Sequence, residues 1–243
     1  MLQPGLASTN GNDGTPAARD RDLRRYYHRL LGEFGPQGWW PAETQLEVVL
    51  GAILTQNTTW RNAALAIGRL REAGMLDMAR LRATHTGRLQ SLIRPAGFFK
   101  QKARTIQGLV RWLGDAHGGS IDRMFDQPAE RLREELLQLR GLGPETVDAM
   151  LLYAGGRPFF VADAYTRRIL ARHGMVPGDA NYHEAQQSIH RGLDRDTAVY
   201  NEFHALLVEV GKRYCRLQAP RCGGCPLEEF LPERERRPAT TAV

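Results

Sequence analysis

Hydrophobic residues recur along most of this chain at intervals of three or four positions, the spacing of an α-helix with one buried face. One such stripe holds Leu46, Val49, Leu50, Ile53 and Leu54. Comparable stripes cover 23–34, 60–70, 89–93, 106–113, 132–139 and 200–210. The run FFVAD (159–163) is short and has no neighbouring segment with which to pair as strands. The pattern predicts an all-α fold of about ten short helices.

Residues with known preferences for helix ends mark several boundaries. Pro128 suits the start of a helix, where its missing N–H leaves no partner unbonded. Asn181, with Glu184 three residues later, resembles a capping box. Gly211 is expected to close the last long helix. These signals agree with the boundaries that the hydrophobic stripes predict.

Charge narrows the class of partner. The chain of 243 residues carries 33 Lys and Arg against 27 Asp and Glu, a formal net charge of +6. Basic residues gather in RRILAR (167–172) and KRYCRLQAPR (212–221), which makes a polyanionic partner plausible. The alternative is a solvated surface with surplus arginine.

The sequences of the chain ends and of the apolar runs indicate where in the cell the protein is found. Residues 1–20 and 233–243 are polar or rich in Gly and Pro, and we expect disordered tails there. The first residues lack the pattern of a secretory signal, and apolar runs stay below the roughly 18–20 residues of a membrane span. These features predict a cytoplasmic protein, associated with the nucleoid if it binds DNA, and no membrane contact.

The stretch LRGLGPET predicts a tight turn between two helices. Gly141 and Gly143 permit a positive φ and a close approach of the backbone, and the following proline fixes φ at the first position of the second helix. The amides from Leu142 and Gly143 through the first turn, which includes Thr146, are then expected to point outward unpaired. Such donors suit a phosphate. The alternative is a Gly-stopped helix followed by a Pro-started one, with no ligand.

A single carboxylate follows this hairpin. Asp163 ends the apolar run FFVAD and precedes YTRRIL, in a basic neighbourhood. Aspartate is a favoured N-cap, so Asp163 can simply cap the next helix. A cap can also face a cleft, and the two interpretations are compatible.

A Gly-x-Gly hairpin between helices, a loop with Gly and Pro, and then an aspartate resemble the helix-hairpin-helix base-excision DNA glycosylases. LTQNT (54–58) and RPAGFFKQKA (94–103) are similar to further segments of that family. Within it, the chain resembles endonuclease III and, more closely, the bacterial 3-methyladenine DNA glycosylase III type. The closer resemblance rests on WWP (39–41), LGAILTQNT (50–58) and GLGPETVDAML (141–151).

The resemblance implies two helical domains that flank a DNA-binding cleft. A six-helix barrel domain at 40–157 would contain the hairpin, and 21–39 plus 158–232 would form a second helical domain with a C-terminal cysteine loop. Gln56 is implied to fill the gap left by a flipped nucleotide. Asp163 is implied to stabilise an oxocarbenium-like transition state or to activate water. The implied partner is double-stranded DNA containing a damaged base, bound by a monomer.

Glu145 bears on the type of reaction. Bifunctional members of the family carry a lysine at this position, two residues after the second glycine, and its amine forms a Schiff base with the sugar. A carboxylate cannot form an imine, so the resemblance implies a monofunctional enzyme in which water displaces the base. Glu145 then either complements the helix dipole or faces the lesion pocket.

Two adjacent tryptophans are candidates for a base pocket. An electron-poor base favours aromatic faces, so Trp39 and Trp40 could hold it, and packing in the core is the alternative. A cationic alkylated purine is already a good leaving group, so its enzyme needs chiefly recognition. Leu46 stands where the alkyl-base type carries a phenylalanine, which leaves the lesion itself open.

The three cysteines lie in one segment, CRLQAPRCGGC, as Cys215, Cys222 and Cys225. This clustering argues for metal or redox chemistry rather than disulfides. In endonuclease III four cysteines hold a [4Fe–4S] cluster, and the first three are similar in spacing here, with Leu231 at the fourth position. The resemblance thus implies a [4Fe–4S] cluster, and the chemistry itself needs no cofactor. The alternatives are a cluster whose fourth iron takes water or a carboxylate, for which Glu228 and Glu229 are nearby, a three-iron form, zinc, or a decayed loop.

Four functional hypotheses follow. The first is a monofunctional DNA glycosylase that removes a 3-methyladenine-like base. A rival is an endonuclease III-like glycosylase and AP lyase acting on oxidised pyrimidines. The third, a non-catalytic DNA-binding module, would keep the hairpin and have no need of Asp163. An all-helical protein–protein scaffold would explain the helices and leave the Gly-x-Gly…Asp arrangement unexplained.

Overall fold

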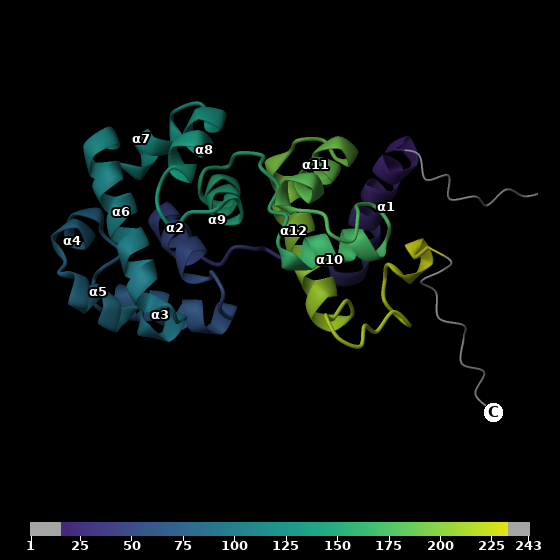
Figure 1. The fold of residues 1–243 in the computed structure, drawn as a ribbon, viewed down its shortest axis with the longest axis horizontal. Coiled ribbons are helices and arrows are strands. Elements are labelled where there is room, and N and C mark those ends of the chain that lie inside the picture. Colours follow the sequence, from purple (N-terminus) through teal and green to yellow (C-terminus); the bar gives the residue numbers. More distant parts are fainter. Residues whose placement is uncertain (1–15, 233–243) are drawn as a thin grey trace, which may run out of the picture. The chain divides into compact units, whose positions relative to one another are not determined.

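The computed structural model describes residues 16–232, and Figure 1 traces their helices. These residues contain twelve α-helices, three short helical segments and no β-strand, which confirms the all-α prediction. The predicted tails lie outside the described residues, except that 16–20 belong to the first helix, α1. None of the described helices is long and apolar enough to cross a membrane.

The chain divides into two compact units. One comprises, among the described residues, 37–163 and 195–205, and we call it the hairpin unit. The other comprises 16–36, 164–194 and 206–232, and we call it the cysteine unit. The hairpin, Gln56, the two adjacent tryptophans and Asp163 all belong to the hairpin unit, whereas the cysteines belong to the cysteine unit.

The hairpin unit is a bundle of short helices. In chain order they are α2 (Gln45–Leu54), α3 (Trp60–Glu72), α4 (Met78–Ala83), α5 (Thr86–Leu92), η1 (Arg94–Ala96), α6 (Phe99–His117), α7 (Ile121–Phe125), α8 (Ala129–Leu137), α9 (Pro144–Ala149) and the π-helical segment η2 (Met150–Ala154). Pro128 is the N-cap of α8, one position earlier than the first helical residue that its missing N–H would suit.

Helix α2 is the centre of the hairpin unit. Every residue from Leu46 to Leu54 is buried, and a helix that is buried on all sides must be enclosed by others. It contacts α3, α6, α9 and η2. The loops and helix ends that carry the candidate site are therefore built around α2.

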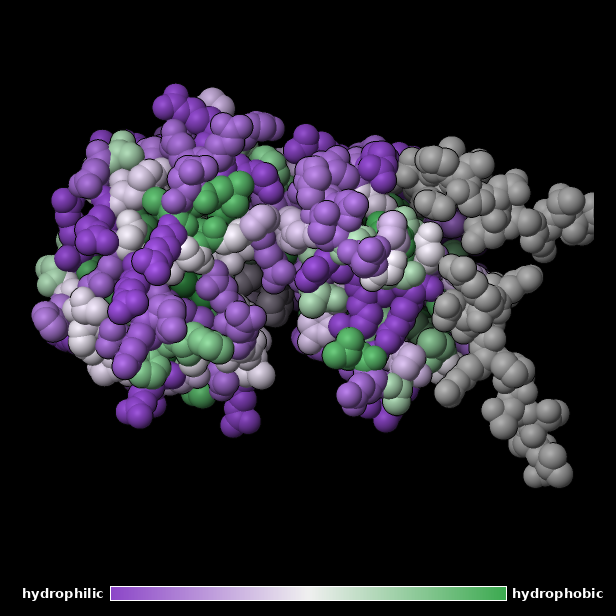
Figure 2. Space-filling view, in the orientation of Figure 1, coloured by the Kyte–Doolittle hydropathy of each residue, from purple (hydrophilic) through white to green (hydrophobic). Residues whose placement is uncertain are grey.

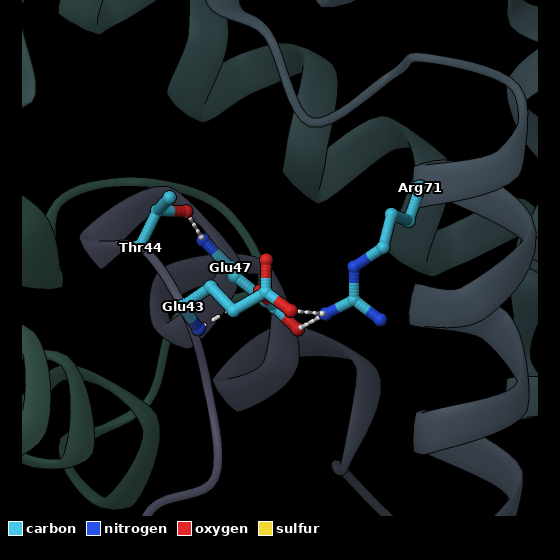
Figure 3. Close-up of polar contacts among 4 residues, drawn as sticks. All are labelled: Glu43, Thr44, Glu47 and Arg71. Atoms are coloured by element: carbon cyan, nitrogen blue, oxygen red, sulfur yellow. Dashed lines mark hydrogen bonds and ion pairs between the residues drawn. The ribbon is translucent and has the colours of Figure 1, made fainter.

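The start of α2 is fixed by a small polar network, which Figure 3 shows. The Thr44 hydroxyl caps the helix by accepting from the Glu47 N–H at 3.2 Å. The Glu47 carboxylate is 4% exposed, accepts from the Glu43 N–H at 3.1 Å, and pairs with the Arg71 guanidinium from α3. A buried carboxylate is tolerated because it is paired in this way. The network holds the segment that follows the two tryptophans against α3.

The cysteine unit is made of α1 (Pro16–Phe34), α10 (Ala164–Arg172), α11 (Tyr182–Gly192), the second half of α12 (Thr197–Arg213) and η3 (Glu228–Phe230). Helix α1 buries Leu23, Tyr26 and Leu30 and packs on α11. The predicted capping box starts α11 as expected: the Asn181 side chain accepts from the Glu184 N–H at 3.0 Å, and Glu184 accepts from the Asn181 N–H at 2.8 Å.

The prediction that Gly211 closes the last helix was wrong, because α12 continues to Arg213. This glycine serves close packing instead. A Cβ at Gly211 would lie 2.2 Å from the ring of Tyr165 on α10, so only glycine permits these two helices to approach so closely.

The surface visible in Figure 2 is mostly hydrophilic, with apolar residues in small patches. Among the described residues, the exposed large hydrophobic side chains are Leu65, Phe98 and Leu217. Scattered apolar residues of this kind are normal on a folded surface.

Candidate functional site

The hairpin between α8 and α9 depends on one of its two glycines. Gly141 has φ +90°, and a Cβ there would lie 2.1 Å from the Thr105 hydroxyl of α6. Gly143 has φ −98°, and a Cβ there would meet no atom of residues 16–232 within 4 Å. The expectation that both glycines serve a positive φ therefore holds for Gly141 and is wrong for Gly143. Nothing in the described part of the chain requires glycine at Gly143, which lies exposed at the N-cap of α9.

The backbone donors of the hairpin are fewer than the sequence predicted. The Leu142 N–H donates to the Leu139 carbonyl at 3.1 Å, and the Leu142 side chain is buried, so this amide is paired and does not point outward. In α9 the first amide to bond along the helix is that of Val147, to the Gly143 carbonyl at 3.0 Å. The exposed part of the helix start is thus Gly143 to Glu145. Glu145 lies in the first turn of α9, where a carboxylate complements the helix dipole.

Gln56 and Thr146 lie together beneath the hairpin. The Gln56 side-chain amide donates to the Gly141 carbonyl at 3.0 Å and to the Thr146 hydroxyl at 2.8 Å. Thr146 is buried, and Gln56 is partly exposed. In this structure both side chains brace the turn, so Gln56 would have to leave these bonds to enter a DNA helix.

The turn that carries Gln56 is itself anchored by a buried lysine. The Lys102 ammonium donates to the Leu54 carbonyl at 2.9 Å and to the Ala96 carbonyl at 2.8 Å. Burial lowers the pKa of Lys102 to about 8. The same lysine thereby joins the end of α2 to the segment before Phe98, an exposed aromatic residue with φ 45° that sequence reasoning did not single out.

Four aromatic rings form a cluster in the hairpin unit. The ring centroid of Trp60 lies 4.8 Å from that of Trp39 and 4.9 Å from that of Trp40. Trp40 in turn lies 5.2 Å from Tyr153 of η2. A Cβ at Gly51 of α2 would lie 3.0 Å from the Trp40 ring, so the small residue makes room for it. The tryptophans are partly exposed rather than sealed in the core, as a base pocket requires.

Asp163 lies at the other end of this cluster. It follows the buried residues Phe160, Val161 and Ala162 and directly precedes α10. Its side chain is 15% exposed, and Oδ2 lies 3.7 Å from Nε2 of His204 in α12. The His204 Nδ1 forms a 2.5 Å hydrogen bond with the Tyr153 hydroxyl. Burial, and then the neighbouring Asp163 and Glu202, raise the pKa of Tyr153 well above its ordinary value, so this phenol stays neutral.

Sequence reasoning predicted Asp163, Trp39 and Trp40 as site residues, and the structure places Trp60, Tyr153 and His204, which it did not single out, beside them. The missed residues come from α3, η2 and α12, which are far apart in the chain. Hydrophobic periodicity assigns such aromatic positions to the core, so no local signal separated them from packing residues.

The three cysteines line one small pocket in the cysteine unit, together with Leu231. Leu231 is buried, and the Cys215 sulfur accepts from the Arg172 guanidinium at 3.2 Å. Burial, followed by the nearby Cys215 and Cys222, raises the pKa of the Cys225 thiol to about 11. Among the described residues no group of three or more His, Cys, Asp or Glu is arranged to hold a metal ion. The donor set does not fit a cluster held by four thiolates, because an apolar side chain occupies the fourth position.

Known proteins share this fold. The trapped covalent complex of endonuclease III with DNA superimposes with a TM-score of 0.77, at 23% identity over 90% of this chain and 98% of that one. The 3-methyladenine DNA glycosylase MagIII of H. pylori, bound to 1,N6-ethenoadenine, gives a TM-score of 0.69 at 25% identity, over 80% of this chain and 97% of that one. A putative DNA repair glycosylase of Methanocaldococcus jannaschii is 41% identical over 209 residues, which is 86% of this chain and 94% of the relative.

Fold and comparisons together define an all-helical DNA glycosylase. The family model described as HhH-GPD superfamily base excision DNA repair protein matches residues 50–195, and the chain belongs to that superfamily. Membership confirms the helix-hairpin-helix resemblance and the enzyme class, and the DNA complexes among the structural neighbours support DNA binding.

Proposed function

We propose that this protein is a monofunctional DNA N-glycosylase that hydrolyses the glycosidic bond of a flipped, alkylated purine similar to 3-methyladenine. It would act as a monomer on duplex DNA in the cytoplasm. The observation that carries the proposal is the placement of Asp163: a partly exposed carboxylate at one end of a partly exposed aromatic cluster.

The proposed chemistry follows from these two parts. Stacking against Trp39, Trp40 and Trp60 would hold an electron-poor base outside the helix, where its bond to the sugar can be reached. Positive charge develops on the sugar as that bond breaks, and the Asp163 carboxylate would stabilise it or orient the attacking water. Glu145 supports the monofunctional assignment, because no amine stands at that position to form an imine.

The hairpin would grip one DNA strand. A phosphate at the start of α9 would lie at the positive end of the helix dipole, beside Gly143. The space around Gly143 is open, so a phosphate could approach the backbone closely. A role in phosphate binding would explain why glycine stands at position 143, since no neighbouring group among the described residues requires it.

A panel of duplexes tests the proposal. Purified protein would be incubated with DNA containing 3-methyladenine, thymine glycol or uracil, and scored separately for free base and for strand nicks. We expect free 3-methyladenine without nicks. Release of uracil or thymine glycol alone would reject the alkylpurine assignment.

The endonuclease III-like alternative rests on the 0.77 TM-score and makes a separate prediction. An AP lyase forms a Schiff base that borohydride reduces to a covalent adduct on abasic DNA. We expect no adduct, and an adduct that depends on a particular lysine would establish the alternative.

A further inference from the structure

A hydrogen-bonded pair, Tyr153 and His204, lies next to Asp163. The Tyr153 hydroxyl of η2 contacts the His204 Nδ1 at 2.5 Å, and the His204 Nε2 lies 3.7 Å from the Asp163 Oδ2. His204 is 7% exposed, and its Nε2 is buried without a hydrogen-bond partner among the described residues. A buried polar nitrogen in this state is costly, so its retention requires an explanation.

The hydrogen bond to Tyr153 determines the tautomer of His204, and therefore whether the Nε2 that faces Asp163 carries a proton. The phenol is neutral, and by donating to Nδ1 it leaves the histidine proton on Nε2. The opposite tautomer would point the bare lone pair of Nε2 at a carboxylate, which is electrostatically unfavourable. The Nε2–H therefore faces Oδ2, at a distance that a shift of less than about 1 Å would close to a hydrogen bond.

We propose that His204 is a positioning residue for Asp163: its Nε2–H holds Oδ2 and so fixes the orientation of the carboxylate, and Tyr153 fixes the required tautomer. This inference rests on the proposed function of Asp163. It also links base recognition to catalysis, because the Tyr153 ring contacts Trp40 on its other side.

Among the groups near His204, Asp163 is the acceptor placed to receive the Nε2–H. Ionisable groups lie near the pair on three elements: Tyr153 of η2 bonds to His204, Asp163 in the loop before α10 lies 3.7 Å from it, and the charge of Glu202 in α12 acts on Tyr153. Glu202 already accepts from the Gln37 N–H at 2.7 Å. Phe160 packs beside the imidazole, with ring centroids 6.2 Å apart, and shields it from water.

The tautomer can be measured in the free, full-length protein, independently of any activity. Nitrogen-15 NMR of the imidazoles should show His204 with a protonated Nε2 and an Nδ1 that accepts a hydrogen bond. In Tyr153→Phe this preference should be lost and a mixture of tautomers should appear. A wild-type His204 protonated on Nδ1 alone would overturn the proposal.

Single-turnover base release across a pH series supplies the functional test. In His204→Leu we expect a rate lower by about ten- to a hundred-fold, because the carboxylate is no longer held in place. The acid limb of the profile should move to higher pH, since the ionised carboxylate loses a donor, while affinity for DNA is retained. His204→Gln, whose amide can place an N–H near the same point, should recover part of the rate.

Tyr200→Phe is the matched control, because it removes another buried hydroxyl one turn earlier in α12. Its pH profile should match that of the wild type. Wild-type activity with an unchanged rate and pH profile in His204→Leu would overturn the positioning role alone. A wild-type protein that releases no base from any lesion would instead reject the proposed function, and the NMR result would still decide the tautomer. If His204→Leu does not fold, Tyr153→Phe carries the kinetic test, with the same shift of the acid limb expected.

Discussion

Replacing the two hairpin glycines one at a time separates a folding role from a DNA-binding role. In Gly141→Ala, a side chain is forced into a left-handed conformation, which costs about 1–2 kcal/mol. The new Cβ also lies 2.1 Å from the Thr105 hydroxyl, and overpacking of this kind costs about 1–3 kcal/mol. The sum, about 2–5 kcal/mol, is a large part of the stability of a typical protein.

Gly143→Ala should leave the stability almost unchanged and weaken DNA binding. Its φ of −98° suits any residue, so alanine gains about 0.4–1 kcal/mol by restricting the unfolded chain. Alanine is a poorer N-cap than glycine by a similar amount, and the two effects offset each other. A phosphate held against this helix start would, however, be pushed away. Loss of one charge-assisted hydrogen bond costs about 1.5–3 kcal/mol, or about ten- to a hundred-fold in affinity.

Urea unfolding and fluorescence anisotropy with an abasic-analogue duplex, at one salt concentration, measure the two effects. We expect Gly141→Ala to be strongly destabilised, with part of the loss recovered by adding Thr105→Ala. Gly143→Ala should unfold like the wild type and bind DNA more weakly. Wild-type affinity in Gly143→Ala would refute the claim that a DNA strand lies against this position.

Two further predictions concern the cysteine unit. Burial lowers the pKa of His173 to about 4, so between pH 4 and 6.5 the unfolded chain binds a proton that the folded chain does not. Stability should be complete above pH 6.5 and fall by up to about 3 kcal/mol as the pH drops through this window. Thermal melts at pH 5 and 7 should show that His173→Asn loses this dependence of stability on pH. The variant His183→Asn, at an exposed histidine, should keep it. A wild-type pH dependence in His173→Asn would contradict the assignment. Leu231→Cys supplies the missing fourth thiol. After anaerobic reconstitution with iron and sulfide, both proteins would be treated with a chelator, and the variant should retain more of its absorbance at roughly 400 nm than the wild type. Equal retention by the two proteins would show that Leu231 does not limit cluster binding.

Local signals in the sequence predicted local structure well. Pro144 begins α9, Gly141 takes a positive φ, and Asn181 forms its capping box with Glu184, because each depends on neighbours within a few positions. The π-helical turn after α9, which packs against α2, had no such signal.

The site was only partly predictable, because its geometry is non-local. Asp163 could be located from the motif that it ends. Its contact with His204 joins residues 41 positions apart, and that between Tyr153 and His204 spans 51. Neither spacing carries a pattern that a single sequence reveals. The paired amide of Leu142 escaped prediction for a related reason, as its bond to Leu139 depends on how tightly the turn closes.

The most direct test of the central claim compares wild-type protein and Asp163→Asn on a duplex containing 3-methyladenine, at protein concentrations that saturate the DNA. The variant keeps the size of the side chain and removes its charge. We expect both proteins to bind the duplex with similar affinity, and base release by the variant to fall by at least about a hundred-fold. Undiminished base release by Asp163→Asn would contradict the account.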